Sequence, residues 1–206
     1  DFTLKNTTIT RINSNAFQNT DLTACINFDL PKKLESLDSS IFNNTKFNKD
    51  TVITIPKTLK TCGNWDNPSF QGCTFNHLKI EYGMTILPER IFQDCTIADS
   101  TFTLKDTTIT SIKYGAFQNT NLTACTNFDL PKNLVSLDGC IFYKVKFNQD
   151  AVITIPKTLT NPTTDYENPS FKGCTFYHLK FEDGITTLPE RIFQDCTIAD
   201  PTFTLK

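Results

Sequence analysis

Residues 152–159 read VITIPKTL, and the same eight residues occur 100 positions earlier, at 52–59. They belong to a much longer duplication, since LPERIFQDCTIAD also occurs twice, at 87–99 and at 188–200. The offset is 101 for this second motif, because the later copy carries one additional residue between the two motifs. The chain therefore consists of two near-identical long units, residues 1–100 and 101–201, followed by a partial third start at residues 202–206.

Each long unit divides further into repeats of about 25 residues. Short stretches with apolar residues at alternate positions recur along the chain, and consecutive stretches are 24–26 residues apart. The second apolar residue of each stretch is Leu4, Leu30, Ile55, Ile80, Leu104, Leu130, Ile155, Phe181 or Leu205. A period of this length is typical of leucine-rich repeats, which bury their apolar faces only by stacking on one another. The sequence predicts a single solenoid of eight repeats over residues 1–206, with a partial ninth strand at 202–206.

The alternating stretches predict the strands of a parallel sheet. Alternation of apolar and polar residues is the pattern of a half-buried strand. Proline follows these stretches at Pro31, Pro56, Pro131 and Pro156, where it would end the strand. We expect an α/β or mainly β solenoid whose concave sheet has nine parallel strands, centred near residues 3, 29, 54, 79, 103, 129, 154, 180 and 204. Short helical turns or second short strands would form the convex side.

Phenylalanine dominates the large apolar residues, with 18 in the chain against one tryptophan and one methionine. One phenylalanine recurs in every repeat, as Phe17, Phe42, Phe70, Phe92, Phe117, Phe142, Phe171 and Phe193. In-register stacking would place these rings in one interior column. We interpret the column as core rather than as a platform for a ligand.

Two insertions interrupt the repeats, CGNWDN at residues 62–67 and NPTTDYEN at 161–168. They carry Trp65 and Tyr166, each five residues before the phenylalanine of its repeat. Insertions often lie on the binding face of a solenoid, so both aromatic residues are candidate binding residues. The alternative is that they fill the interior position that Ile12 or Leu87 occupies in other repeats.

The motifs IPKTL, LPERIFQDCT and SFQGCTF resemble the BspA-type leucine-rich repeat of bacterial and protist surface proteins. The resemblance covers all eight repeats, with the recurrent phenylalanines at its A-F position. Its cysteine position holds Cys73, Cys95, Cys174 and Cys196, whereas Thr20, Thr45 and Val145 depart from it. The resemblance implies a solenoid at the cell surface or secreted, used for adhesion or protein binding, and it carries no catalytic motif.

Composition and charge exclude other classes of partner. The net charge of −2 gives no electrostatic reason to expect nucleic acid or an acidic membrane surface as partner. No apolar run approaches the roughly 18 residues of a transmembrane helix, so we expect no membrane insertion by this segment. The chain begins and ends inside a repeat, and we expect it to be a fragment whose export signal and anchor lie elsewhere.

The residues that could hold a metal or a cofactor give no site, and we expect neither. The eight cysteines contain no C-x-x-C pair, and the 22-residue spacings from Cys73 to Cys95 and from Cys174 to Cys196 follow the repeat. Neighbouring repeats are close enough for a disulfide, but interior thiols are the preferred interpretation. His77 and His178 lie too far apart to share a metal. The pairs Glu89–Arg90 and Glu190–Arg191 indicate a charged turn outside the core.

The outward-facing residue of each predicted strand gives the candidate ligand-binding line on the concave face. It comprises Thr3, Asp29, Thr54, Lys79, Thr103, Asp129, Thr154 and Lys180. Such a flat polar face suits a protein or matrix ligand better than a small molecule, which prefers an apolar pocket. The leading hypothesis is therefore a non-enzymatic binding or adhesion module.

Three other functions compete with this hypothesis. A structural spacer needs only length, and the near-identity of the two units favours it. A β-helix enzyme acting on polysaccharide would need paired carboxylates, whereas Asp29 and Asp129 stand singly. An ice-binding threonine array is interrupted by aspartate and lysine. The matching FTLK sequences at both ends also predict weak end-to-end self-association, since unpaired sheet edges are templates for further pairing.

Overall fold

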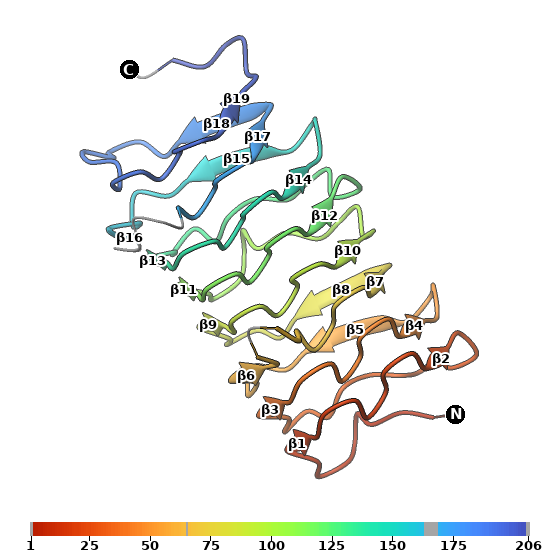
Figure 1. Ribbon diagram of the computed structural model, residues 1–206. Coiled ribbons are helices and arrows are strands. Elements are labelled where there is room, and N and C mark those ends of the chain that lie inside the picture. Colours follow the sequence, from red (N-terminus) through yellow and green to blue (C-terminus); the bar gives the residue numbers. More distant parts are fainter. Residues whose placement is uncertain (1, 65, 163–168, 205–206) are drawn as a thin grey trace.

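The computed structural model describes residues 2–64, 66–162 and 169–204. These residues form a parallel β-solenoid of about seven turns without a helix. Successive turns stack from the N-terminal to the C-terminal end, so that each contacts the turn before and the turn after it (Figure 1). The predicted solenoid with second short strands is confirmed, and the helical turns offered as the other option do not occur in the described part of the chain.

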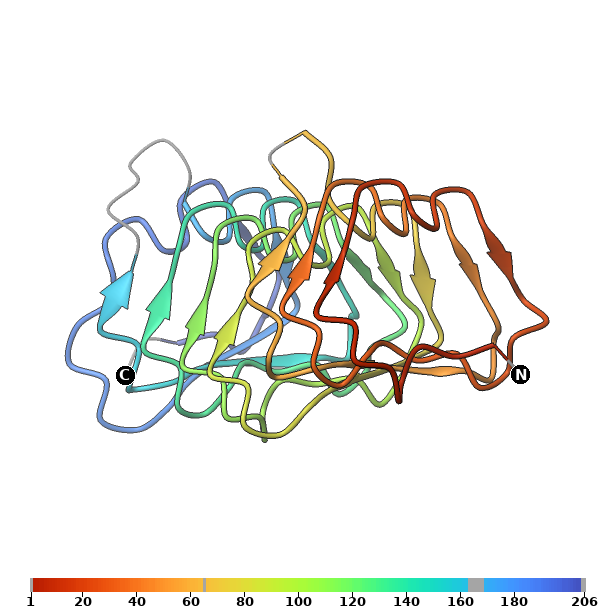
Figure 2. The same cartoon turned by 90° about the horizontal axis from the view of Figure 1, so that it is seen from below.

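The strands lie in three lines on different sides of the solenoid (Figure 2). The first line comprises β1 (Arg11–Ile12), β3 (Ser36–Leu37), β6 (Thr61–Cys62), β9 (Ile86–Leu87), β11 (Ser111–Ile112), β13 (Ser136–Leu137) and β16 (Asn161–Pro162). The second comprises β2 (Asp21–Leu22), β4 (Lys46–Phe47), β7 (Thr74–Phe75), β10 (Thr96–Ile97), β12 (Asn121–Leu122), β14 (Lys146–Phe147), β17 (Thr175–Phe176) and β19 (Thr197–Ile198). The third comprises β5 (Val52–Ile55), β8 (His77–Ile80), β15 (Val152–Ile155) and β18 (His178–Phe181).

The third line is the predicted sheet, but it is interrupted. β5 pairs with β8, and β15 pairs with β18, each in the parallel in-register arrangement that the repeat demands. The chain around Thr3, Asp29, Thr103 and Asp129 forms no strand, so the prediction of nine strands in one sheet is wrong. The partial ninth strand at 202–206 extends past the described residues and stays a prediction.

Side-chain oxygens account for the interruption. The Thr103 hydroxyl accepts a hydrogen bond from the backbone N–H of Asp129 at 3.2 Å, and Oδ1 of Asp129 accepts one from Thr154 N–H at 2.7 Å. Short polar side chains of this kind compete with the backbone ladder for its donors. The turns remain stacked, since Leu104 N–H still reaches the carbonyl of Asp129 at 3.1 Å.

The recurrent phenylalanines form the core that the sequence predicts. Six of the eight rings are fully buried, while Phe17 and Phe193, in the outer turns, are partly buried. Several neighbouring rings are almost parallel, as between Phe42 and Phe70 (centroids 5.1 Å apart, 5° between planes) and between Phe142 and Phe171 (4.9 Å, 5°), whereas Phe92 and Phe117 are tilted by 39°. Offset stacking of this kind adds about 0.5–1.5 kcal/mol per pair to the burial of the rings.

The recurrent cysteine position of the repeat supplies a hydrogen-bond donor between turns. Sγ of Cys73 donates to the Phe42 carbonyl at 2.8 Å, and Sγ of Cys95 to the Phe70 carbonyl at 3.0 Å. Thr45 takes the same role, since its hydroxyl donates to the Phe17 carbonyl at 2.6 Å. The departure from cysteine at Thr45 therefore preserves the contact.

The two insertions coincide with breaks in the first and second lines. Among the described strands, β6 does not pair with β9, β4 does not pair with β7, and β14 does not pair with β17. Extra residues in one turn separate the strands that flank them from those of the neighbouring turn. The uninterrupted part of the solenoid lies between the insertions, where four-stranded sheets occur in both lines.

Candidate binding surfaces

Four of the predicted binding residues form two adjacent pairs on the third line. Thr54 lies opposite Lys79 between β5 and β8, and Thr154 lies opposite Lys180 between β15 and β18. Both lysines are exposed and both threonines are partly buried. Each pair presents an ammonium group beside a hydroxyl, and ligand binding there stays a prediction.

Asp29 and Asp129 are buried, which corrects the prediction that they point outward. Their side chains are only 6% exposed. Oδ1 of Asp29 accepts hydrogen bonds from the backbone N–H groups of Leu30 and Thr54, both at 2.9 Å. Oδ2 lies 3.2 Å from Nζ of Lys5. Asp129 makes the corresponding contacts. Each carboxylate thus links neighbouring turns. Its hydrogen bonds and its lysine offset the cost of burying the charge.

The remaining predicted residues do not complete an exposed line. The hydroxyls of Thr3 and Thr103 accept hydrogen bonds from the backbone N–H groups of Lys5 and Lys105, at 3.3 Å and 3.2 Å. The structure therefore brings together two threonine–lysine pairs rather than one continuous column. Trp65 and Tyr166 lie outside the described residues.

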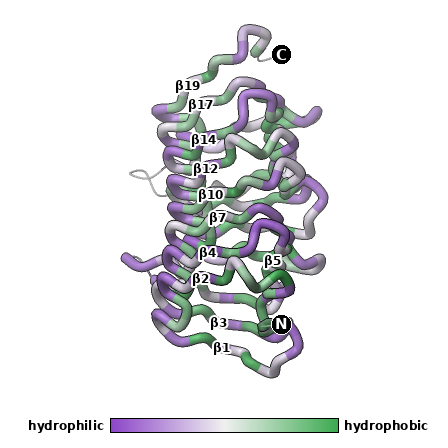
Figure 3. The backbone as a smooth tube through the Cα atoms, turned by 90° about the vertical axis from the view of Figure 1, so that its right-hand side faces the viewer, coloured by the Kyte–Doolittle hydropathy of each residue, from purple (hydrophilic) through white to green (hydrophobic). Residues whose placement is uncertain are grey.

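A different surface emerges when the two units are aligned at their offset. It lies on the turn edge, defined here as the segment that leads from the first line to the second, residues 13–20 in the first turn and their equivalents in the others. The turn edge lies at the top of Figure 2 and along the left side of Figure 3, where hydrophilic residues predominate. On this edge the second unit has Tyr114, Tyr143, Lys144 and Lys172 where the first has Ser14, Asn43, Asn44 and Gln71. This difference is present in the sequence, and a residue-by-residue comparison of the two units would have found it.

Together with Arg90, these four residues form the tyrosine–lysine cluster. The guanidinium carbon of Arg90 lies 4.9 Å from the ring centroid of Tyr114, and Nζ of Lys144 lies 5.0 Å from that of Tyr143. Both distances fall within the range of a cation–π interaction. Backbone hydrogen bonds connect the members across turns, from Arg90 N–H to the Tyr114 carbonyl at 3.0 Å and from Lys144 N–H to the Lys172 carbonyl at 2.9 Å.

The cluster borders an open hollow of about 470 Å³. Its lining consists of Arg90, Tyr114, Tyr143 and Lys172 with Asp66, Gln93, Gln118 and Cys140. The Tyr114 hydroxyl lies 3.4 Å from Sγ of Cys140, so side chains of two successive turns are in contact within the hollow. Hydrogen-bonding groups and two aromatic rings thus face the same space.

Arg90 corrects the prediction of a charged turn outside the core. It is only 2% exposed, and Nη1 donates to Oε1 of Gln93 at 2.8 Å while Nε lies 3.2 Å from Oε1 of Glu89. Its counterpart Arg191 has a side chain 46% exposed and does lie at the surface. The next turn, which carries Tyr114, covers Arg90, and this packing is not evident from the identical local sequence.

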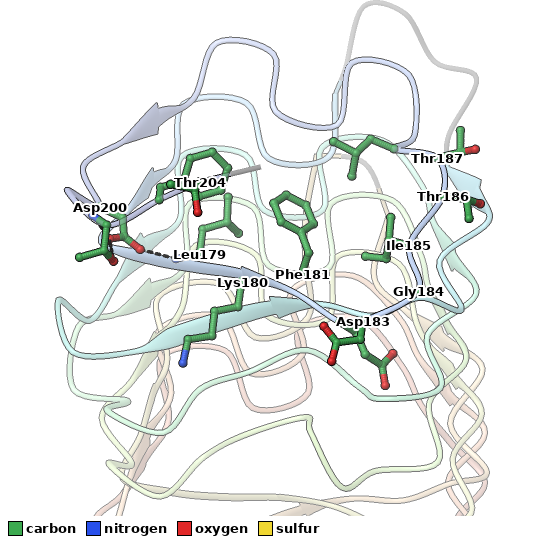
Figure 4. A pocket seen from close by; sticks show the side chains of 14 residues that line it. Leu179, Lys180, Phe181, Asp183, Gly184, Ile185, Thr186, Thr187, Asp200 and Thr204 are labelled. Carbon is green, nitrogen blue, oxygen red and sulfur yellow. Dashed lines mark hydrogen bonds between the residues drawn. The ribbon is translucent and has the colours of Figure 1, made fainter. Parts of the chain in front are cut away.

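A second hollow, of about 560 Å³, lies at the C-terminal end of the solenoid (Figure 4). Leu179, Phe181 and Ile185 point towards it, while Lys180 and Asp183 point away. One carboxylate oxygen of Asp200 accepts a hydrogen bond from Leu179 N–H at 3.3 Å.

The cysteines form no site for a metal or a nucleophile. All eight are free, and six are buried, while Cys25 and Cys196 are partly exposed. Burial raises the pKa of the Cys62, Cys73 and Cys125 thiols to about 12, because a thiolate is poorly solvated inside the protein. The interior thiols are confirmed, although Cys196 is less buried than predicted. Across the described ranges no three potential ligand residues are grouped to hold a metal ion.

Comparison with known proteins assigns the fold to a family. The family model of the BspA type leucine rich repeat region matches residues 1–66 and 64–200, in six copies. The chain therefore belongs to the BspA-type leucine-rich-repeat family. No curated protein and no solved structure matches it. Among the described residues, no helix has the length and apolar character needed to cross a membrane.

Proposed function

We propose that this chain is a non-enzymatic protein-binding or adhesion module of a cell-surface or secreted protein. The observation that carries the proposal is the tyrosine–lysine cluster, because tyrosine is enriched among the residues that dominate binding energy at interfaces and both tyrosines are partly exposed. Membership of the BspA-type family supports a solenoid role at a surface. A solenoid of about seven turns also offers a long exterior for contact with a large partner.

The burial of the aspartates argues against hydrolysis of polysaccharide. That reaction requires two carboxyl groups flanking the bond to be cleaved. Asp29 and Asp129 are each committed to two backbone N–H groups and one lysine. They are thus occupied as structural acceptors and cannot approach a sugar.

The test is a pull-down of a panel of purified extracellular-matrix proteins with the immobilised 206-residue chain. An unrelated solenoid of similar size and net charge serves as control. We expect saturable capture of at least one panel member by this chain and none by the control. Equal capture by both would contradict the proposal.

The alternative function is a spacer that holds another domain away from the cell. The near-identical interiors of the two units favour it, since length alone would be selected. Absence of binding to every panel member, with the fold verified by circular dichroism, would support the spacer over the binding module.

A further inference from the structure

We infer that the tyrosine–lysine cluster binds an acidic, extended polypeptide segment of a protein partner. The inference rests on the proposed function, since it names the place and the chemistry of the contact. Its evidence is the geometry of Arg90, Tyr114, Tyr143, Lys144 and Lys172, together with what the second unit lost in acquiring the last four.

The first unit shows what was lost. Nδ2 of Asn43 donates to Oε1 of Gln71 at 2.9 Å, and Nε2 of Gln71 donates to Oδ2 of Asp94 at 3.2 Å. These bonds tie three successive turns together along the turn edge. Tyr143 and Lys172 replace the two amides in the second unit, and Nζ of Lys172 lies 3.9 Å from Oδ2 of Asp195. Two amide hydrogen bonds are thus exchanged for one long ion pair, and exposed ion pairs of this kind contribute little to stability.

The backbone at Lys144 leads to the same conclusion. Lys144 has a φ angle of 54°, as does Asn44 in the first unit. Asparagine is among the few residues other than glycine that adopt this left-handed conformation readily, because its short side chain can bond locally. Lysine lacks this advantage, so the exchange works against the local backbone preference. The second unit therefore has a residue on the turn edge that is less favourable for the local backbone conformation. A binding role of the ammonium group would explain why lysine occurs there.

The charges around the hollow favour an acidic ligand. Lys144 carries its charge over the Tyr143 ring, and the ion pair of Lys172 within the described part of the chain is the long one with Asp195. Nearby Lys113, which replaces Asn13, also forms a long ion pair, with Nζ 3.6 Å from Oδ2 of Asp138. Exposed pairs at such distances contribute little, so a ligand carboxylate can approach these ammonium groups more closely. Asp66 and Glu89 also lie at the border, and the partner's acidic groups would have to avoid them.

The layout favours an extended segment. The cluster takes its members from four successive turns, and stacked strands are about 4.8 Å apart. The cluster is therefore about 14 Å long, the length of four or five residues of extended chain. Two rings within this length can pack against the backbone and side chains of such a segment, with Gln93 and Gln118 as hydrogen-bonding neighbours. A peptide running along the solenoid axis fits these dimensions.

The direct test measures binding of a fluorescein-labelled twelve-residue peptide of alternating glutamate and serine to the 206-residue chain by fluorescence anisotropy. A peptide of alternating lysine and serine is the charge-reversed control. The key variant restores the residues of the first unit, with Tyr114→Ser, Tyr143→Asn, Lys144→Asn and Lys172→Gln. We expect saturable binding of the acidic peptide, no binding of the basic one, and at least about tenfold weaker binding to the variant.

The matched control variant is Lys79→Gln with Lys180→Gln, which removes as many charges from the exposed third line. It should bind the acidic peptide like the parent chain. Equal loss in both variants would indicate nonspecific charge attraction and would overturn the inference. Loss in the control variant alone would locate the site on the third line and would also overturn it.

Two further outcomes separate this inference from the proposed function. If heparin displaces the acidic peptide at lower concentration than an unlabelled copy of that peptide, the cluster is a site for anionic polysaccharide and the inference is wrong. If a panel protein binds the parent chain and the four-residue variant equally well, the binding module stands while the inference fails. Loss of that binding in the variant, with unchanged circular dichroism, supports both.

Discussion

The two long units are alike inside and different along the turn edge. Phe42 and Phe142 occupy equivalent stacked positions, and Asp29 and Asp129 make equivalent contacts. On the turn edge, by contrast, a ladder of amides in the first unit gives way to tyrosine and lysine in the second. Residues that are identical in the two units are those that stacking of the turns requires. Residues that differ between the units lie at positions where stacking does not restrict the side chain.

The largest expected effect comes from ionising the buried thiols of the shared interior at high pH. Unfolding exposes thiols whose ordinary pKa is near 9, whereas burial raises the pKa of Cys62, Cys73 and Cys125 to about 12. The folded state therefore retains protons that the unfolded state releases. The free energy of unfolding should be independent of thiol ionisation below about pH 8 and fall steeply from about pH 9 upwards. Urea titrations at a series of pH values measure it.

The control for this pH dependence uses a matched pair of cysteines. Cys125 is buried, whereas its counterpart Cys25 is partly exposed. The Cys125→Ala variant should lose stability less steeply above pH 9 than the parent chain does, because it lacks one of the buried thiols. Cys25→Ala is the matched reference for the loss of a thiol side chain at the equivalent position. A slope of Cys125→Ala equal to that of the parent chain would contradict the prediction.

Removal of one ring from the phenylalanine column comes next. Phe142 lies between Phe117 and Phe171 at centroid distances of 5.3 Å and 4.9 Å, and Phe42 lies between Phe17 and Phe70 at 5.2 Å and 5.1 Å. We expect Phe42→Ala and Phe142→Ala each to lower the free energy of unfolding by about 3–5 kcal/mol. Chemical denaturation of both variants would show a shared interior as similar losses. A difference of several kcal/mol would break the comparison.

The buried aspartates should have a somewhat smaller effect. Asp129→Ala would leave the N–H groups of Leu130 and Thr154 and the ammonium group of Lys105 without the carboxylate. We expect a loss of about 3 kcal/mol, because unsatisfied buried donors are costly. Asp29→Ala should behave alike. Asp129→Asn retains one acceptor oxygen and should lose less, and an equally large loss would assign the effect to the lysine pair.

Removing or adding a hydroxyl at the family's cysteine position should change the free energy of unfolding in opposite directions. Thr45→Val removes the hydrogen bond to the Phe17 carbonyl, and we expect a loss of about 1 kcal/mol. Val145 occupies the equivalent position in the second unit. The reciprocal change Val145→Thr should add the contact to the Phe117 carbonyl and stabilise the chain by up to about 1 kcal/mol. Thermal unfolding of both variants checks the prediction, and a loss in both would contradict it.

The smallest effect on stability belongs to the turn edge. Tyr143→Asn combined with Lys172→Gln restores the amide pair of the first unit. We expect no loss of stability and a gain of no more than about 0.5 kcal/mol, since the positions lie at the surface. Calorimetry of this variant would detect a hidden structural role as a clear loss. Such a loss would remove the argument that the second unit gave up stability there.

The sequence by itself determined the solenoid, because its period of about 25 residues cannot bury apolar faces in any other way than by stacking. It also determined which residues are core, since in-register stacking places every recurrent phenylalanine in one column. Pro56 and Pro156 likewise marked the ends of β5 and β15, because proline cannot donate to the ladder.

Only the tertiary structure decided where polar side chains point between turns. Asp29 alternates with apolar residues as an outward residue would, yet the N–H groups of the adjacent Leu30 and of Thr54 in the next turn hold its carboxylate inside. The charged sequence around Arg90 likewise indicates an exposed turn, yet the following turn, which carries Tyr114, covers the guanidinium group. The physical reason is the same in both cases. Periodicity fixes the distance between turns, whereas the fate of a polar group depends on which partner the neighbouring turn presents to it.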